Sequence, residues 1–481
     1  MLTDLYQLTM AQAYFASGMA TAHGCFHLSF REGPFGGGFA VACGLQQALD
    51  FLDGFAFSAE DLAYLASVKG ADGSEVFTRD FLGWLAELRF DCDVAGVPEG
   101  TVVFPREPIL RVSGPLPTCQ LVETALLNCI NFSTLVATKA ARCCIAAEGD
   151  PILEFGLRRA QGPDGGLTAS RAAYVGGCSA TSNVLAGQAF GIPVAGTHAH
   201  SWVMAFDSEA EAFRSYVDAL PNNVVLLVDT YDTLEGVRHA VEVGSRMRER
   251  GQKLLGIRID SGDLAWLSRR AREILDEHGF TDTRIIASNE LDEYLISSLK
   301  DQGAAVDSWG VGTKLVTGWD QPALGGVYKL SAIRRPSDET WIPRIKVSEQ
   351  TAKVTTPGVL GVRRYRRPDG SLAGDMVYDV HAAPGHDATM VDPADVTRRK
   401  SFTPDQHHEE LLVPVFEGGE RVCECPPLSE SREAALRGVA ELDPTVKRFL
   451  NPHVYPVGLE RSLYDLRTAL VLEARGIATE G

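Results

Sequence analysis

Positive charge is scarce in this chain. Its 481 residues include 45 Lys and Arg against 63 Asp and Glu, which gives a formal net charge of −18. Nucleic acids and anionic membrane surfaces would repel such a protein, so general binding to either is excluded. A small anionic ligand remains compatible with this balance, but its binding site must then be locally basic.

The sequence also lacks the marks of export and of membrane insertion. No basic segment followed by an apolar run opens it, because Asp4 follows the start and Tyr6, Gln7 and Thr9 interrupt the apolar residues. No stretch approaches the ~20 apolar residues that a membrane span requires. We therefore expect a cytoplasmic protein, in which disulfides are discouraged.

The ten cysteines contain no CxxC pair, so we expect buried thiols. His23, Cys25 and His27 alternate along a predicted strand at 23–30, where they could bind zinc. No fourth ligand lies nearby, and a strand beside a solvated face is the simpler interpretation.

The length allows two or three domains with large cores. Helices are predicted at 1–19, at 116–148, where a long apolar segment leads into the core, and at 168–190, where no acidic residue occurs. Five short apolar runs follow, each ending in polar residues, at 192–195, 224–228, 254–259, 284–287 and 306–311. This alternation is typical of a parallel barrel or a doubly wound sheet, whose active site lies at the carboxyl ends of the strands.

The ends of these predicted strands carry residues suited to phosphate chemistry. Gly310–Thr313 and Ser288-Asn289 offer backbone N–H groups and hydroxyls that can hold a phosphate. Asp260 suits a sugar diol or the Mg²⁺ carried by a diphosphate. Arg258 and the pair Arg158-Arg159 supply local positive charge.

Two histidines, His198 and His200, alternate after the first of the five runs. A metal site would need further ligands, and none is suggestively spaced, so metal binding by His198 or by the cysteines stays open. Because His200 lies among arginines, aspartates and phosphate-binding loops, a general acid/base or phosphoryl-acceptor role competes with a structural one.

Several motifs in order resemble those of the nicotinate phosphoribosyltransferase family. They are LTDLYQ at 2–7, PFGGG at 34–38, FGLRRAQG at 155–162, GTHAHS at 196–201, RIDSGD at 258–263 and GVGT at 310–313. The likeness runs over most of the chain and is weakest after residue 335.

The resemblance implies that nicotinate and phosphoribosyl diphosphate give nicotinate mononucleotide and diphosphate in NAD salvage. It implies a ligase-type coupling to ATP hydrolysis through a phosphohistidine, with Mg²⁺ as cofactor and ATP as co-substrate. It also implies a homodimer with active sites at the subunit interface. We expect an irregular, incomplete α/β barrel core at 136–335, an N-terminal α/β domain at 1–135 and a C-terminal mixed domain at 336–481.

The same resemblance implies roles for individual residues. His200 would be phosphorylated by ATP, and Arg258 and Asp260 would complete the catalytic set. Tyr6 of the neighbouring subunit and Phe155 would stack on the pyridine ring. The predicted substrate-binding residues are Tyr6, Phe155, Arg158, Thr197, Ser261, Gly262, Asn289, Gly312 and Thr313. Thr197 and Arg258 would bind nicotinate, and Arg158 would bind the anionic groups. Asp260 would bind the ribose hydroxyls, and Gly312 with Thr313 would bind the 5′-phosphate. His198 stands where many relatives have a different residue, so no catalytic part is assigned to it.

Two other enzyme classes remain as alternatives. A nicotinamide-using relative would favour an acidic acceptor for the amide, whereas the acid-free segment 168–190 with Arg171 favours nicotinate. A phosphate-binding α/β-barrel isomerase or aldolase is the second, and Lys314 is the nearest lysine to a strand end that an aldolase would need. A non-catalytic nucleotide binder would be expected to have lost His200, Arg258 or Asp260, and all three are present.

Overall fold

The computed structural model describes residues 1–350, 353–385 and 388–477. It divides into two compact units. Unit 1 comprises Met1–Leu135 and Ala323–Gly481, and unit 2 comprises Val136–Pro322. The predicted mixed α/β architecture with an incomplete barrel core is confirmed. The further division into three domains at 135 and 335 stays a prediction.

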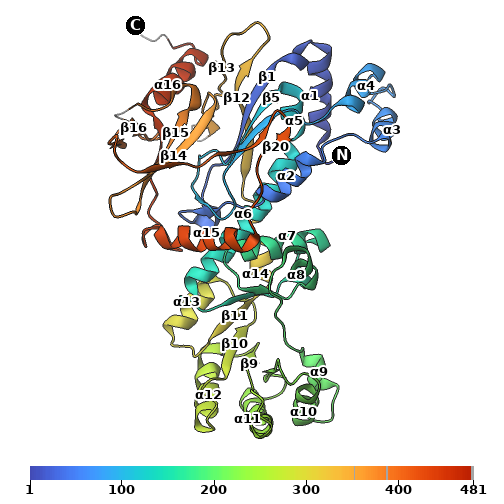
Figure 1. Cartoon of the computed structure of the whole chain (residues 1–481), viewed down its shortest axis with the longest axis vertical. Helices are drawn as coiled ribbons and strands as arrows, with labels where there is room; N and C mark the ends of the chain where they lie inside the picture. The colour runs from blue at the N-terminus through green and yellow to red at the C-terminus, as the bar shows by residue number, and fades with distance from the viewer. Residues whose placement is uncertain (351–352, 386–387, 478–481) are drawn as a thin grey trace. The chain divides into compact units, whose positions relative to one another are not determined.

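Unit 2 is built on a six-stranded sheet in which all neighbouring strands are parallel. In sheet order the strands are β7 (Ala180–Thr181), β6 (Ile152–Glu154), β11 (Ser308–Val311), β10 (Arg284–Ser288), β9 (Gly256–Ile259) and β8 (Val225–Leu227). Figure 1 labels the neighbouring strands β11, β10 and β9. The last four predicted apolar runs form β8 to β11. The first run, 192–195, forms only one isolated bridge to the sheet, between Thr181 and Val194.

Helices connect the strands of unit 2. They are η3 (Leu157–Arg159), α7 (Gly162–Val175), α8 (Val184–Phe190), α9 (His200–Met204), α10 (Glu209–Ala219), α11 (Thr233–Glu249), α12 (Leu264–Glu277), α13 (Glu293–Asp301) and α14 (Thr313–Val316). Asp232, Asp263 and Asp292 cap α11, α12 and α13 by accepting a backbone N–H of the first turn. These caps satisfy N–H groups that the helix leaves unpaired.

The predicted single helix at 168–190 is wrong. Helix α7 ends at Val175, and β7 and α8 follow as separate elements. Gly177 has φ +117°, which a helix cannot accommodate. A Cβ at Gly176 would lie 2.1 Å from the Ala137 carbonyl oxygen, so the two glycines both break the helix and permit close packing.

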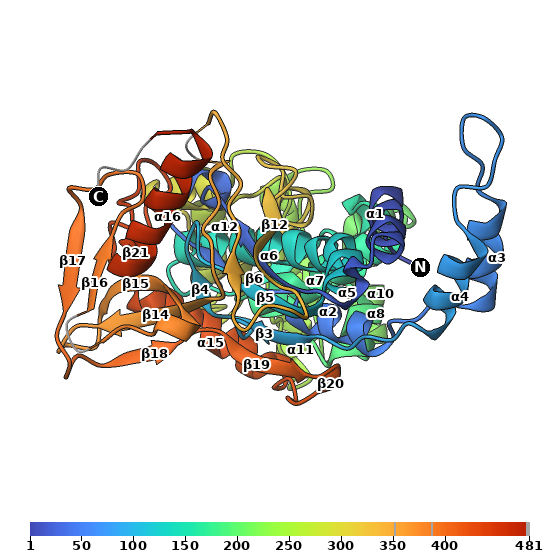
Figure 2. The same cartoon turned by 90° about the horizontal axis from the view of Figure 1, so that it is seen from above.

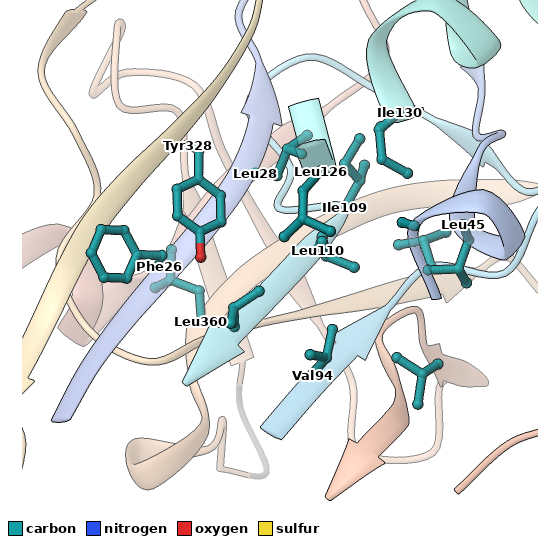
Figure 3. Packing of buried hydrophobic residues seen from close by; sticks show 14 of the residues in the cluster. Phe26, Leu28, Leu45, Val94, Ile109, Leu110, Leu126, Ile130, Tyr328 and Leu360 are labelled. Atoms are coloured by element: carbon teal, nitrogen blue, oxygen red, sulfur yellow. The ribbon is translucent and has the colours of Figure 1, made fainter. Parts of the chain in front are cut away.

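Unit 1 contains a seven-stranded antiparallel sheet. Its order is β13 (Ile342–Pro343), β12 (Gly326–Arg334), β1 (His23–Phe30), β5 (Leu110–Pro115), β3 (Asp93–Gly96), β19 (Val413–Glu417) and β20 (Glu420–Arg421). Figure 3 shows its apolar face, where Phe26 stacks on Tyr328 with ring centroids 4.9 Å apart. Leu110 and Leu126 extend this buried cluster.

A second sheet of unit 1 has six strands, with only β15 and β21 parallel among its neighbours. Its order is β17 (Arg399–Phe402), β16 (Ala388–Val391), β21 (Val457–Glu460), β15 (Leu372–Asp379), β14 (Leu360–Arg366) and β18 (His408–Glu410). Helix α16 (Arg461–Ala474) packs beside β16 and β21 (Figure 2).

The remaining elements of unit 1 are a small sheet and a set of helices, the last of which continues past Leu135 into unit 2. The strands β2 (Ala40–Val41) and β4 (Val102–Val103) form a two-stranded sheet. The helices are α1 (Leu5–Ala16), η1 (Met19–Thr21), η2 (Pro34–Gly36), α2 (Leu45–Asp53), α3 (Ala59–Ser67), α4 (Arg79–Glu87), α5 (Leu116–Leu121), η5 (Val380–Ala382) and α15 (Leu428–Glu441), and α6 (Glu123–Ala146) follows α5. The predicted helix at 1–19 is thus confirmed as α1.

The expectation that no stretch is apolar enough to cross a membrane is corrected by α5 and α6. Together they span the 31 residues Leu116–Ala146 and reach that threshold by length and composition alone. About two thirds of the most apolar window, 67%, is buried inside the protein. Such burial is typical of a core helix, as the predicted long apolar segment leading into the core requires.

The predicted solvated face of β1 is wrong. Cys25 is fully buried and His27 is 6% exposed. The Leu360 N–H donates to His27 Nε2 at 3.1 Å, and His27 Nδ1 lies 2.8 Å from Ser331 Oγ. Because Nε2 accepts, Nδ1 carries the ring proton. Burial, helped by Arg111, lowers the pKa of His27 to about 3.

This buried neutral ring predicts an acid-labile part of the stability of unit 1. Since the folded pKa lies below the unfolded value, the stabilisation is complete above pH ~6.5 and is lost as the pH falls toward 3. In His27→Gln, which keeps an acceptor but does not titrate there, denaturant unfolding between pH 7 and 4 should show a smaller loss of free energy. Wild type should lose roughly 1.4 kcal/mol more per pH unit inside the window. Parallel curves for the two proteins would contradict the prediction.

Candidate active site

The carboxyl ends of the parallel strands in unit 2 bring most of the predicted site residues to one edge of the sheet. Phe155 follows β6, Asp260 follows β9, Asn289 follows β10 and Gly312 follows β11. Ser261 and Gly262 belong to the loop after β9, Thr313 begins α14, His200 begins α9 and Thr197 lies in the loop before it. The predicted convergence of these residues at strand ends is therefore present in the fold.

Asp260 is held by two hydrogen bonds and lies close to His200. Its N–H donates to Asp229 Oδ2 at 2.9 Å, and the Ser288 hydroxyl donates to its Oδ1. Its Oδ2 faces His200 Nε2 at 3.8 Å. His200 is 39% exposed and Asp260 31%, so both groups remain accessible to a ligand.

Asp229 is a site residue to which the sequence analysis gave no role. It is 9% exposed, and its Oδ2 also accepts from the Ser261 hydroxyl at 2.6 Å. Its other oxygen, Oδ1, is buried without a hydrogen-bond partner among the described residues. A polar residue directly after the apolar run 224–228 was the available signal. Gly262, with φ +80°, completes the turn that this carboxylate supports.

Arg258 is half-buried and directs its guanidinium toward Thr197. Its Nη1 donates to Thr197 Oγ1 at 2.6 Å, and its Nε has no partner within the described part of the chain. Burial lowers the pKa of Arg258, against the opposing influence of Asp260 and Asp229, and Arg158 lowers it further. Arg158, exposed on η3, thus adds a second positive charge to this neighbourhood.

Phe155 lies across the end of β11. Its N–H donates to the Val311 carbonyl at 2.8 Å. A Cβ at Gly310 would lie 2.7 Å from the Phe155 ring, so only glycine lets the ring rest on this strand. The Thr313 hydroxyl donates to Glu290 at 3.1 Å, which the phosphate-loop hypothesis did not foresee. Asn289 is exposed with φ +102°.

Beneath Phe155 lies a second residue that sequence reasoning missed, Glu154. It is fully buried, and its carboxylate accepts from the Gly156 N–H and from the Thr181 and Ser170 hydroxyls, the last at 2.8 Å. Asn183 in turn donates to Ser170 at 3.1 Å. Neutral donors alone therefore satisfy this oxygen pair, and they fix the turn that carries Phe155 and Arg158.

Tyr6 lies in unit 1, outside the parallel sheet that carries the other predicted site residues. Tyr6 is 50% exposed on α1 of unit 1, and its predicted contact with a neighbouring subunit's site stays a prediction. Among residues 1–350, 353–385 and 388–477, no group of three or more His, Cys, Asp or Glu is arranged to hold a metal ion by itself.

Unit 1 holds a cavity of about 460 Å³ that the sequence analysis did not anticipate. Its lining includes the basic residues Arg31, Arg106, Lys329, Lys353 and Arg467, and no acidic side chain is among the lining residues that the structure describes. The basic residues are dispersed along the sequence, so no local motif announced the cavity. In a chain of net charge −18, such a lining is the local basic environment that an anionic ligand requires.

Three family models match most of this chain. The one described as "Nicotinate phosphoribosyltransferase (NAPRTase) family" matches residues 151–354. The N-terminal and C-terminal domain models of the same enzyme match residues 1–131 and 361–467. A nicotinate phosphoribosyltransferase of Bacillus subtilis is 42% identical over 477 residues, covering 98% of this chain and 95% of its own. The chain belongs to the nicotinate phosphoribosyltransferase family.

Other members of the nicotinate phosphoribosyltransferase family are similar over the same length. Nicotinate phosphoribosyltransferase 2 of Arabidopsis thaliana is 37% identical over 530 residues, covering 97% of this chain and 93% of its own. The crystal structure of human nicotinic acid phosphoribosyltransferase superposes with a TM-score of 0.84 at 33% identity, covering 98% of this chain and 100% of that one. The predicted family membership is confirmed.

The hydrogen bonds to Glu154 predict that replacing this residue lowers the stability of the protein, whereas replacing an exposed glutamate does not. Glu154→Gln keeps the volume but turns an amide N–H toward hydroxyl and backbone donors, so the free energy of unfolding should fall by about 1–3 kcal/mol. The matched control is Glu277→Gln at the exposed end of α12, which should leave stability unchanged. Equal unfolding curves for both variants would refute the structural role of Glu154.

Proposed function

We propose that this chain is a nicotinate phosphoribosyltransferase of NAD salvage, coupled to ATP hydrolysis through phosphorylation of His200. The observation that carries the proposal is the gathering of His200, Asp260 and Arg258 at one edge of the parallel sheet, in a member of this family. The relatives named above supply the reaction, and the geometry gives each residue a chemical task.

Nicotinate is the proposed ligand of Arg258, Thr197 and Phe155. The Nε of Arg258 is a buried donor without a partner among described residues, which suits the carboxylate of nicotinate. The half-buried Phe155 ring offers a face on which the pyridine ring can stack. Stacking holds the ring without a proton donor, so the pyridine nitrogen keeps the lone pair that its attack on the ribose C1 requires.

The transfer itself is a displacement. The pyridine nitrogen bonds to the ribose C1 while the bond from C1 to the diphosphate oxygen breaks. Because the transition state resembles an oxocarbenium ion, positioning and charge stabilisation do most of the catalysis. Asp260 is placed to accept hydrogen bonds from ribose hydroxyls, and Arg158 to balance the leaving diphosphate.

The ATP step is assigned to His200 Nε2. His200 Nδ1 lies 3.2 Å from Thr230 Oγ1, a contact in which the Nδ1 proton can be donated, and this leaves a lone pair on Nε2. Nε2 attacks the γ-phosphorus of ATP, the N–P bond forms as the bond to the β-phosphate oxygen breaks, and ADP leaves. Hydrolysis of the phosphohistidine later returns the histidine and inorganic phosphate.

Mg²⁺ is part of the proposal as an ion that arrives with the phosphates. It usually binds proteins through one or two carboxylates and substrate oxygens, and it neutralises a departing diphosphate. Asp229 fits this requirement because its buried Oδ1 lacks a partner in the described structure. Asp260 beside it would be the second carboxylate.

The basic cavity of unit 1 supports the same reaction class. Its five basic side chains suit phosphate-bearing ligands, which an acidic protein can hold only where positive charge is concentrated. We include in the proposal a cytoplasmic homodimer in which Tyr6 reaches the neighbouring subunit's pyridine site, since Tyr6 is exposed on α1.

The two alternatives are less well supported. An enzyme that uses nicotinamide would need a hydrogen-bond acceptor for the amide N–H groups. The group beside Thr197 is instead the hydrogen-bond donor Arg258. For an aldolase, Lys314 would need to be a free amine, but its Nζ forms an ion pair with Asp292 at 2.6 Å.

The test is incubation with nicotinate, phosphoribosyl diphosphate and Mg²⁺, with and without ATP, followed by detection of diphosphate and nicotinate mononucleotide. Diphosphate release that ATP stimulates supports the proposal. Supplying nicotinate and nicotinamide together at equal concentration separates the first alternative, since preferential use of nicotinamide would overturn our choice.

His200→Ala is expected to abolish the stimulation by ATP while the protein stays folded, because the phosphoryl acceptor is removed. The rates of diphosphate release with and without ATP should then agree within about twofold, because a ratio this small corresponds to almost no difference in the activation barrier. His278→Ala, at the end of α12, is the matched control and should keep the stimulation. Persistent ATP stimulation in His200→Ala would refute the phosphohistidine.

Asp260→Asn is expected to impair the use of phosphoribosyl diphosphate, because the variant loses a charge next to the ribose and the proposed Mg²⁺. We expect kcat/KM for this substrate to fall by about 10²-fold, equivalent to ~2.7 kcal/mol of transition-state stabilisation. Steady-state kinetics with the exposed control Asp276→Asn measure it. Wild-type kinetics in Asp260→Asn would remove that residue from the site.

A further inference from the structure

His198 has no part in the function proposed so far, yet it lies between Thr197 and His200. It is only 7% exposed. Its Nε2 accepts the N–H of Leu227 at 3.1 Å, and its Nδ1 lies 3.4 Å from the Ala199 carbonyl oxygen. Since Nε2 is an acceptor, the ring proton is on Nδ1.

Leu227 ends β8, which is the last strand on its side of the parallel sheet. The next N–H, that of Val228, donates to the Arg258 carbonyl of β9 at 3.1 Å. Alternate N–H groups of a strand point to opposite sides, so the Leu227 N–H points away from β9, toward the free edge. Leu227 is fully buried, and its N–H would be costly to leave unpaired. His198 supplies the acceptor that the sheet cannot.

Aromatic rings hold the imidazole in place. Tyr216 meets it edge-on with centroids 4.8 Å apart, and Phe213 lies at 6.1 Å. This desolvation lowers the pKa of His198 to about 4, and the nearby Arg258 and His200 act in the same direction. The ring is therefore neutral, and an acceptor, throughout the range in which the enzyme is expected to work.

The hydrogen bond from the Leu227 N–H to His198 joins two segments of the chain, and the same two segments also meet at His200. Three residues after Leu227, Thr230 Oγ1 lies 3.2 Å from His200 Nδ1. The segment 198–200 and the segment 227–230 are thus tied at both ends, once through His198 and once through His200. The first tie sets the position of the backbone that carries His200, and the second, at Nδ1, leaves Nε2 facing Asp260 Oδ2 at 3.8 Å.

We propose that His198 is a positioning residue that caps the free edge of β8 and thereby orients His200 Nε2 for phosphorylation. The inference rests on the proposed function, in which His200 accepts the phosphoryl group. His198 itself contacts no substrate in this account. It acts through the backbone of the segment that carries Thr197 and His200.

Two substitutions of His198 separate the effect of its hydrogen-bond acceptor from the effect of its aromatic ring. His198→Gln can place a carbonyl oxygen where Nε2 now lies, whereas His198→Phe keeps an aromatic ring without an acceptor. The rate of phosphoryl transfer from γ-labelled ATP to His200 is the readout. We expect a fall of about 10–100-fold in His198→Phe, because misplacing a reacting group by ~1 Å costs up to 10²-fold. His198→Gln should stay within about threefold of wild type, since the acceptor is restored.

A second measurement does not depend on activity or on tolerance of phenylalanine. Hydrogen exchange of the Leu227 amide should be slow in wild type and in His198→Gln. It should be at least about tenfold faster in His198→Asn, whose shorter amide cannot reach. Equal exchange in all three proteins would overturn the cap, and labelling of His200 at the wild-type rate in His198→Phe would overturn the positioning role. If wild type is not labelled at His200 while Leu227 exchange follows the expected order, the phosphohistidine fails and the cap stands.

Discussion

Neighbouring parallel strands have their carboxyl ends at the same edge of a sheet. The residue pairing between these strands determines which polar side chains of the candidate site meet there. Ala287 of β10 pairs with Ile259 of β9, so the next residues on each strand, Ser288 and Asp260, are neighbours and bond to each other. Glu154 pairs with Val311, which brings Phe155 onto the end of β11. A shift of one residue would turn alternate side chains to the other face and separate both contacts.

The charges at this edge are arranged so that the cations are left for a ligand. Glu154 is satisfied by hydroxyls and a backbone N–H, and Asp229 accepts from a backbone N–H and from Ser261. Neither carboxylate uses an arginine in these hydrogen bonds. Arg258 can therefore donate to the neutral Thr197 hydroxyl and keep Nε unused. In a protein with 63 acidic residues against 45 basic ones, the Nε of Arg258 stays unpaired among the described residues because nearby carboxylates have neutral hydrogen-bond donors.

Much of unit 2 could be predicted from the sequence because short-range patterns determine it. Apolar runs ending in polar residues located β8 to β11, and family motifs located Arg258 and Asp260. The break at Gly176-Gly177 was not found because small residues on either side suit a helix equally well. His27 was misplaced because alternation shows which residues share a face, but not that β14 covers that face. The basic cavity gathers residues separated by hundreds of positions, which no local pattern reveals.

His198 and His200 show how the fold separates residues that the sequence presents as equals. They are two positions apart, and an alternating pattern would give them the same surroundings. In the fold, the His198 ring packs against α10. Its Nε2 lone pair accepts the Leu227 N–H, so this nitrogen cannot serve as a nucleophile. His200 begins α9, half exposed, with Nδ1 at Thr230 and Nε2 toward Asp260. In the role that we propose for His198, the buried ring holds the segment that presents His200, so the two histidines differ in task because they differ in burial.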